Sequence, residues 1–163
     1  MCDKTNSDKS PIVENGISIV AIKDLDGCNF RVPNYHRGYR WTRQQVKDLI
    51  DDIFEFTHNF FKNGQKGIYC IQPLVVQKSH NEEGTDCWDV IDGQQRLTTL
   101  FIILKFFDRH LYGLQYQTRV QSADYVNRLA DQLYAEEQKL DNIDFYHMYE
   151  AFEEVSSKLN GYK

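Results

Sequence analysis

No apolar run in the 163-residue sequence approaches the ~18 residues that a membrane span needs. The first residues also lack the basic-then-apolar order of a signal peptide. The four cysteines form no CxxC pair, and the five histidines show no HxxxH or HExxH spacing. These absences argue against a membrane partner, a disulfide framework and a structural zinc site. We therefore expect a cytoplasmic protein.

Charge is distributed unevenly along the chain. The net charge of −5 argues against a protein that coats DNA by bulk attraction. A basic segment nevertheless stands out against the acidic background, and a local site for an anionic ligand is compatible with it. This segment contains Arg31, Arg37, Arg40, Arg43 and Lys47.

Short runs rich in β-branched and aromatic residues, bounded by turn residues, indicate strands. Pro33 should stop one of these strands, because proline cannot donate to the ladder. Pro73 should lie at a bulge or an edge for the same reason. The predicted strands cover residues 17–25, 30–32, 69–77 and 88–91, with a polar hairpin loop over 79–86.

Apolar residues at helical spacing indicate the helices. Thr42 and Gln45 fit a capping box at the start of the first helix. Tyr112-Gly113 should end the second. The last helix is amphipathic and requires a partner, so we expect the sequence to be the N-terminal part of a longer protein; the alternative is that this helix docks on the same domain. The predicted helices cover about 43–62, Leu97 to Leu111, about 122–138 and Asp144 to Leu159.

The stretch Val90-Ile91-Asp92-Gly93-Gln94-Gln95-Arg96 is predicted as a strand that passes directly into a helix. The first N–H groups of a helix lack intrahelical partners and lie at its positive end, so a helix start can bind phosphate. Gly93 lets the chain turn sharply and lets a phosphate come close. Arg96 could fork onto phosphate oxygens, and Gln94 and Gln95 could add neutral donors. Asp92 could hold a phosphate-bound Mg²⁺ through water.

A purely structural explanation of this stretch also fits. Asp92 with Gln95 matches an Asp-type capping box, which needs no ligand. Arg96 argues against that explanation, because a cation in the first turn opposes the helix dipole. An anionic ligand would compensate this charge.

The segment Val32-Pro33-Asn34-Tyr35-His36-Arg37-Gly38-Tyr39-Arg40-Trp41 interleaves aromatic residues with arginines. Aromatic faces can stack on bases and arginines can hold phosphates, which makes Tyr35, Arg37 and Trp41 candidate ligand contacts. The alternative is a packed loop, with Tyr35, Tyr39 and Trp41 in the core and the arginines at the surface. The local pattern alone favours the packed loop.

The order of these motifs resembles the N-terminal domain of the GmrSD-type restriction proteins, a ParB-like family. The likeness rests on Val32 to Trp41, on Val90 to Thr98 with its DGQQR element, and on a late segment from Ile143 to Phe152. It covers nearly all of residues 17–160. The family usually has Gln before the arginine of the first motif, where this chain has His36, which can still donate a hydrogen bond.

The resemblance implies an α+β fold of the ParB/sulfiredoxin type, a small mixed sheet with helices, followed by C-terminal helices. We expect a flexible N-terminus over 1–14, a ParB-like nucleotide-binding domain over 15–115, and a helical extension over 116–163 that begins a further helical region. In the wider ParB group, the strand-to-helix turn binds nucleotide phosphates, and ParB hydrolyses a nucleoside triphosphate. GmrSD-type proteins act against foreign DNA, and their cleavage is attributed to a C-terminal HNH-type domain.

We therefore expect a domain that binds and hydrolyses a nucleoside triphosphate and regulates a DNA-directed restriction protein of phage defence. DNA and a C-terminal nuclease domain or subunit are the expected partners, and nuclease activity is expected only in the presence of that domain. The alternatives are a non-catalytic DNA-binding module, a nuclease domain acting on DNA directly, and a purely structural domain. The candidate residues are Asp92 and Arg96 for catalysis, Gly93, Gln94, Gln95, Arg96, Tyr35, Arg37 and Trp41 for the nucleotide, and Asp92 for Mg²⁺.

Overall fold

The computed structural model describes residues 12, 16–63, 67–80 and 84–163. Within them, a mixed sheet has the strand order β2-β3-β1-β4. The central strand β1 (Asn29–Val32) pairs in parallel with both β3 (Asp86–Asp92) and β4 (Gly113–Tyr116), whereas β2 (Val75–His80) runs antiparallel to β3. The predicted small mixed sheet with helices is therefore confirmed.

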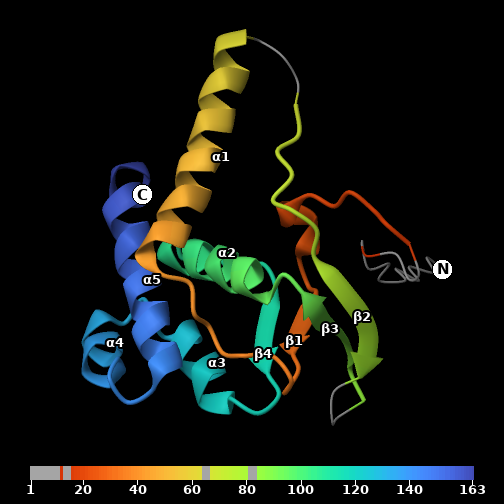
Figure 1. Ribbon diagram of the computed structural model, residues 1–163, viewed down its shortest axis with the longest axis vertical. Coiled ribbons are helices and arrows are strands. Elements are labelled where there is room, and N and C mark those ends of the chain that lie inside the picture. The colour runs from red at the N-terminus through yellow and green to blue at the C-terminus, as the bar shows by residue number, and fades with distance from the viewer. Residues whose placement is uncertain (1–11, 13–15, 64–66, 81–83) are drawn as a thin grey trace, which may run out of the picture.

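The helices cover one side of the sheet and extend away from it. Figure 1 shows α2 between the sheet and α5, with the far half of α1 projecting beyond the rest of the fold. The last helix docks on this domain: Phe152 of α5 packs edge-on against Phe106 of α2, with ring centroids 6.2 Å apart. The α-helices are α1 (Arg43–Asn63), α2 (Gln94–Phe106), α3 (Val120–Asn127), α4 (Gln132–Gln138) and α5 (Ile143–Leu159).

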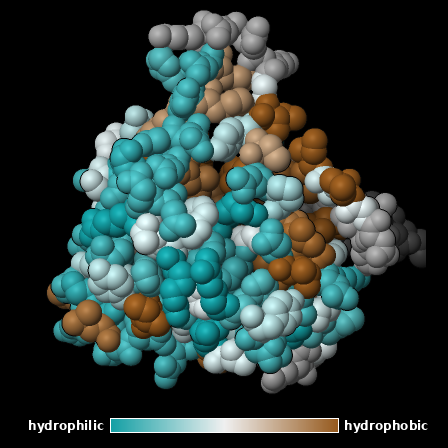
Figure 2. Space-filling model, viewed as in Figure 1, coloured by the Kyte–Doolittle hydropathy of each residue, from teal (hydrophilic) through white to brown (hydrophobic). Residues whose placement is uncertain are grey.

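The predicted strand over 17–25 is wrong. Residues 17–21 lie outside any helix or strand, and Ile22–Leu25 form a short 3-10 helix. Ile17 and Ile19 are exposed, because no neighbouring strand gives their β-branched side chains a surface to cover. On the face seen in Figure 2, hydrophobic residues gather along one side of the molecule, whereas the helical side is mostly hydrophilic.

The hairpin is confirmed, but its strands are shifted. The predicted strand over 69–77 begins only at Val75 and continues to His80, so the loop is shorter than the predicted 79–86. Pro73 precedes the strand, which is the place where its missing N–H costs no ladder bond. Gln72 beside it has a φ of 67°, which takes the chain out of the extended conformation.

The end of the second helix was also predicted wrongly. Helix α2 stops at Phe106, where Asp108 with a φ of 53° turns the chain, and residues 113–116 form β4 instead of a helix end. Gly113 pairs with Asn29 of β1, and an added Cβ at Gly113 would displace the exposed side-chain amide of Asn29. The helical spacing of apolar residues in the sequence continues through Leu111, because apolar side chains on both sides of the turn face the same core.

The predicted single helix over 122–138 is two helices, α3 and α4. The helix is interrupted from Arg128 to Asp131, and Leu129 within the interruption is fully buried. The other helices agree with prediction, and at the start of α1 Gln45 Oε1 accepts from the Thr42 N–H at 2.9 Å, one arm of the expected capping box. The expected flexible segment 1–14 lies, except for residue 12, outside the described residues, and β4 spans the expected boundary between 115 and 116.

Candidate functional site

The three parallel strands end at the same edge of the sheet, and both sequence motifs begin there. The Gly93 turn follows β3, residues 33–42 follow β1, and residues 117–119 follow β4. Ligands of open sheets with parallel strands bind outside the carboxyl ends of those strands. We call these three segments the arginine edge, because they carry Arg96, Arg37 and Arg40, and Arg119 respectively.

The turn at Gly93 has the geometry that the motif predicted. Gly93 has a φ of 93°, in the left-handed region that favours glycine, and α2 starts at the next residue. An added Cβ would lie 3.0 Å from Leu74 Cδ1 and 3.4 Å from the Pro73 carbonyl oxygen. The turn is therefore packed against the segment that precedes β2.

The Asp92–Gln95 capping box does not form. No side chain of the described residues caps the start of α2, and the Asp92 carboxylate ends β3 with 72% of its side chain exposed, 3.7 Å from Arg96 Nη2. The first-turn backbone N–H groups of α2 thus have no side-chain cap, which leaves the positive end of the helix available to an anion. Asp92 is an accessible carboxylate, of the type that holds a nucleotide-bound Mg²⁺.

The two glutamines bind the other motif with their side chains. Gln94 Nε2 donates to the carbonyl oxygens of Arg37 (2.7 Å) and Gly38 (3.4 Å), and Gln95 Nε2 donates to the Gly38 carbonyl (3.0 Å). Gln95 Oε1 accepts from the backbone N–H groups of Arg40 (2.8 Å) and Trp41 (3.2 Å). Gln94 Oε1 is buried and accepts no hydrogen bond from the part of the chain that the structure describes. The glutamine pair therefore holds the 37–41 loop against the start of α2.

Arg96 lies beside the turn with its guanidinium partly exposed. Its Nη1 donates to Gln72 Oε1 at 2.9 Å and its Nη2 to the Pro73 carbonyl at 2.8 Å. Both acceptors are neutral, and the only acidic group within 4.0 Å among the described residues is the exposed carboxylate of Asp92. The positive charge of Arg96 is thus poorly compensated at the helix start.

The aromatic and basic residues of the first motif divide between the surface and the core. Tyr39 is fully buried, and Trp41 is half-buried against the core. Tyr35 is 64% exposed, and the exposed guanidinium of Arg37 has no hydrogen bond or ion pair with any residue that the structure describes. The packed-loop alternative therefore holds for Tyr39 and in part for Trp41, but not for Tyr35.

His36 replaces the usual glutamine and keeps its capacity as a donor. Its Nε2 is 2.7 Å from the carbonyl oxygen of Val90, which can only accept, so His36 is the donor. The Tyr35 ring lies over the imidazole, with centroids 4.8 Å apart. His36 thus joins the loop directly to the end of β3.

A buried carboxylate on α5 is the main feature that sequence reasoning missed. Asp144 is 1% exposed and binds three groups: it is ion-paired with Arg40 Nη1, lies 3.3 Å from Arg119 Nε, and accepts from Ser122 Oγ at 3.1 Å. The predicted start of the last helix near Asp144 was the available signal, but nothing local to it indicates its arginine partners.

Burial sets the protonation of several groups near the edge. It raises the pKa of Tyr39 and of Tyr116, whose hydroxyls share hydrogen bonds with Thr99 (2.8 Å) and Thr98 (2.9 Å) under α2. Partial burial, and then the nearby charge of Arg40, lower the pKa of His147 on α5. The tyrosines therefore remain neutral hydroxyls, and His147 favours its neutral form.

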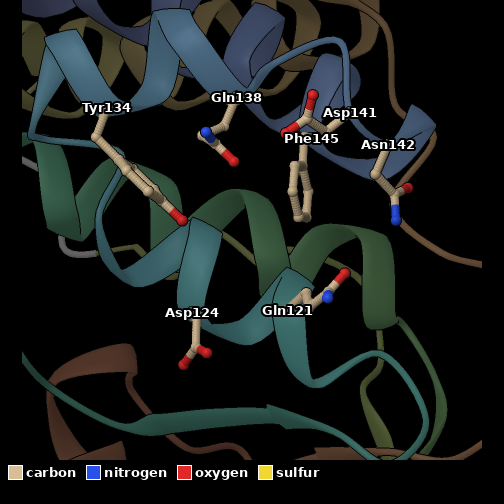
Figure 3. A pocket seen from close by; sticks show the side chains of 7 residues that line it. All are labelled: Gln121, Asp124, Tyr134, Gln138, Asp141, Asn142 and Phe145. Carbon is tan, nitrogen blue, oxygen red and sulfur yellow. The ribbon is translucent and has the colours of Figure 1, made fainter.

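A cleft in the described part of the chain lies away from the arginine edge. Figure 3 shows it between α3, α4 and the start of α5, with Tyr134 and Phe145 directed toward the space and Asp124 directed away from it. Its volume is about 250 Å³, and none of the motif residues line it. A second groove of about 390 Å³ runs along β4 and α3. The arginine edge is thus an open surface site that is not enclosed by either cavity.

Among the described residues, no group of three or more His, Cys, Asp or Glu side chains is placed to hold a metal ion. None of the helices in the same part of the chain has the length and apolarity that a bilayer crossing requires.

Comparison with known proteins agrees with the resemblance of the motifs. No curated protein and no solved structure matches the chain significantly. The family model described as "GmrSD restriction endonuclease, N-terminal domain" matches residues 19–161, which include both motifs, Asp144 and every strand of the sheet. The chain therefore belongs to the family of GmrSD restriction endonuclease N-terminal domains.

Proposed function

We propose that this chain is a regulatory domain that binds a nucleoside triphosphate at the arginine edge and hydrolyses it. The observation that carries the proposal is the placement of arginines on each of the three segments that follow the parallel strands, beside an uncapped helix start, in a chain of net charge −5. A polyphosphate is the ligand that such a concentration of guanidinium groups suits best.

The residues of the edge have distinct roles in this proposal. The first-turn N–H groups from Gln94 to Arg96 and the guanidinium of Arg96 bind phosphate oxygens. The amide side chains of Gln94 and Gln95 hold the loop, so these residues contribute to the phosphate through their backbone. Asp92 positions the nucleotide-bound Mg²⁺ or the attacking water. Phosphoryl transfer depends mainly on positioning and charge neutralisation, for which this set is sufficient.

The opposite wall comes from the loop after β1. The exposed guanidinium of Arg37 is available to a phosphate, and the exposed ring of Tyr35 is available to a base or ribose. Trp41 supports the wall from its partly buried position. The ligand would thus lie between two motifs that the glutamine pair fixes relative to each other.

Family membership supports a role for this domain in a restriction protein, and we propose DNA as the substrate of that protein. We propose that the state of the nucleotide controls a nuclease domain or subunit located C-terminal to this domain, in the cytoplasm. Weak hydrolysis suits such a regulatory domain, because hydrolysis ends the triphosphate-bound state.

Calorimetric titration of the 163-residue chain with each triphosphate, with and without Mg²⁺, tests binding. Phosphate release by the wild type and by Asp92→Asn tests hydrolysis, with Asp89→Asn as a matched control, because Asp89 lies on β3 but pairs with Arg31. We expect binding in both variants and loss of phosphate release only in Asp92→Asn. Binding of duplex DNA but of no triphosphate would identify the chain instead as a non-catalytic DNA-binding module.

A further inference from the structure

The contacts of Asp144 leave an excess of positive charge at the arginine edge. One carboxylate faces two guanidiniums, those of Arg40 and Arg119. The side chains of Arg40 and Arg119 are 28% and 34% exposed, whereas that of Asp144 is 1% exposed. The negative charge is therefore inside the protein, whereas both arginine side chains are partly accessible to solvent.

Two helix starts add to this excess. Asp144 lies in the first turn of α5, and Ser122, which donates to it, lies in the first turn of α3. Each helix start carries a partial positive charge of about half a unit from the aligned peptide dipoles. The sum of these charges and the two guanidiniums exceeds the single charge of Asp144, so a further anion is favoured at this point.

Each arginine also donates to a backbone carbonyl, which fixes its place. Arg119 Nη1 donates to the His36 carbonyl at 2.9 Å, and Arg40 Nη1 donates to the Tyr39 carbonyl at 2.6 Å. Gly38 lets the carboxylate approach the loop, because an added Cβ would lie 2.1 Å from Asp144 Oδ1. The two guanidiniums are thus held in place before any ligand arrives, which lowers the entropic cost of binding.

Arg119 is connected to β3, which leads into the Gly93 turn, through His36. His36 accepts from Arg119 through its carbonyl and donates through Nε2 to Val90, which lies near the end of β3. His36 therefore connects Arg119 to the strand that leads into the Gly93 turn.

We propose that Arg40 and Arg119 form a second phosphate position, at which they bind the terminal phosphates of the nucleotide, and that Asp144 is the residue that positions them. This inference rests on the proposed function and extends it, because it adds to the binding site Arg119 and Asp144, which lie outside both motifs, and gives Arg40 of the first motif a role in binding. Phosphate chemistry is shared by nucleotides and DNA, and the nucleotide is the source that we assign.

The test uses Arg119→Gln in the 163-residue chain, with Arg43→Gln as a matched control. Arg43 is also an ion-paired arginine, but its partner is the partly exposed Glu150 on the outer face of α1 and α5. Affinities for inorganic pyrophosphate, for a triphosphate and for a short DNA duplex are measured by calorimetry, together with the melting temperature. Arg119→Lys is the second variant, because it keeps a charge for Asp144 but loses the planar fork.

We expect Arg119→Gln to weaken pyrophosphate and triphosphate binding by about 10-fold or more, and Arg119→Lys to weaken them less, while Arg43→Gln leaves both unchanged. If Arg119→Gln does not fold, the Arg119→Lys result decides in its place. Triphosphate affinity that depends on Arg96 but is unchanged in both Arg119 variants would overturn this inference and leave the proposed function standing. Arg119-dependent binding of pyrophosphate without triphosphate binding would support the phosphate position and overturn the proposed function. A loss confined to the duplex, or no binding of any probe by the wild type, would overturn this inference.

Discussion

The side-chain oxygen of Gln95, in the first turn of α2, accepts the backbone N–H of Arg40 at 2.8 Å, although 55 residues separate the two. The same oxygen accepts the N–H of Trp41 at 3.2 Å, and the amide nitrogen donates to the Gly38 carbonyl. The sequence position of Gln95 fits a local helix cap, but in the structure its side chain holds the 38–41 loop against the start of α2. We call these three hydrogen bonds the clamp. The clamp makes the DGQQR element and the aromatic-arginine loop one structural unit.

The clamp should contribute measurably to stability. Gln95→Leu removes three hydrogen bonds and leaves partly buried backbone groups unpaired. We expect a loss of about 2 kcal/mol in the free energy of unfolding, or roughly 4–8 °C in melting temperature. Urea unfolding of the wild type and the variant measures this loss in the free energy of unfolding.

The matched control for that variant is Gln44→Leu. Gln44 is exposed on α1 and its amide binds only Asp48, at 2.6 Å, among the described residues. Its replacement should change stability by less than about 0.5 kcal/mol. Equal losses in the two variants would show that the Gln95 contacts contribute nothing specific.

Gly38 should tolerate no side chain. In Gly38→Ala the new Cβ would overlap the carboxylate of Asp144, which cannot move without losing its arginines. We expect a loss of about 3 kcal/mol. Gly161→Ala is the control, because nothing lies within 4 Å of its Cβ position. Thermal unfolding of the pair measures the difference, and a Gly38→Ala protein as stable as Gly161→Ala would contradict the close packing of Asp144 on the loop.

Arg96 should matter more for ligand than for fold. Its two hydrogen bonds go to exposed acceptors, so Arg96→Ala should cost at most about 1 kcal/mol of stability. Loss of a charge-assisted phosphate contact should lower triphosphate affinity by ~30-fold. Calorimetry on Arg96→Ala, with the exposed Arg109→Ala as control, separates the two effects. Unchanged affinity in Arg96→Ala would remove this residue from the site.

Arg37 and Trp41, four residues apart, should respond in opposite ways. Trp41→Ala removes a ring that packs against the core and should lower stability by about 2 kcal/mol. Arg37→Ala removes an exposed side chain and should leave the melting temperature unchanged while weakening triphosphate binding. Scanning calorimetry and titration of both variants check this contrast. A Trp41→Ala protein that melts with the wild type would show that the ring adds no packing energy.

The sequence by itself determined the features that depend on short-range order. The arm of the capping box between Thr42 and Gln45, the start of α2 directly after β3, and the amphipathic α5 all follow from patterns within one or a few turns. Gly93 belongs to this class as well, because its left-handed φ is a property of the residue and its immediate neighbours. For the same reason the sequence correctly located the strand-to-helix turn at Gly93.

Tertiary structure alone decided how these parts meet. Residues 17–25 have strand propensity but no strand of the described residues beside them. Tyr112-Gly113 was predicted to end a helix, but Gly113–Tyr116 form a strand because β1 offers a free edge. Asp144 pairs with Arg40 across 104 residues, and no local pattern distinguishes this carboxylate from the many that face solvent. The energy of a buried ion pair or of a clamping amide comes from its partner and from the exclusion of water, and both exist only once distant segments have packed together.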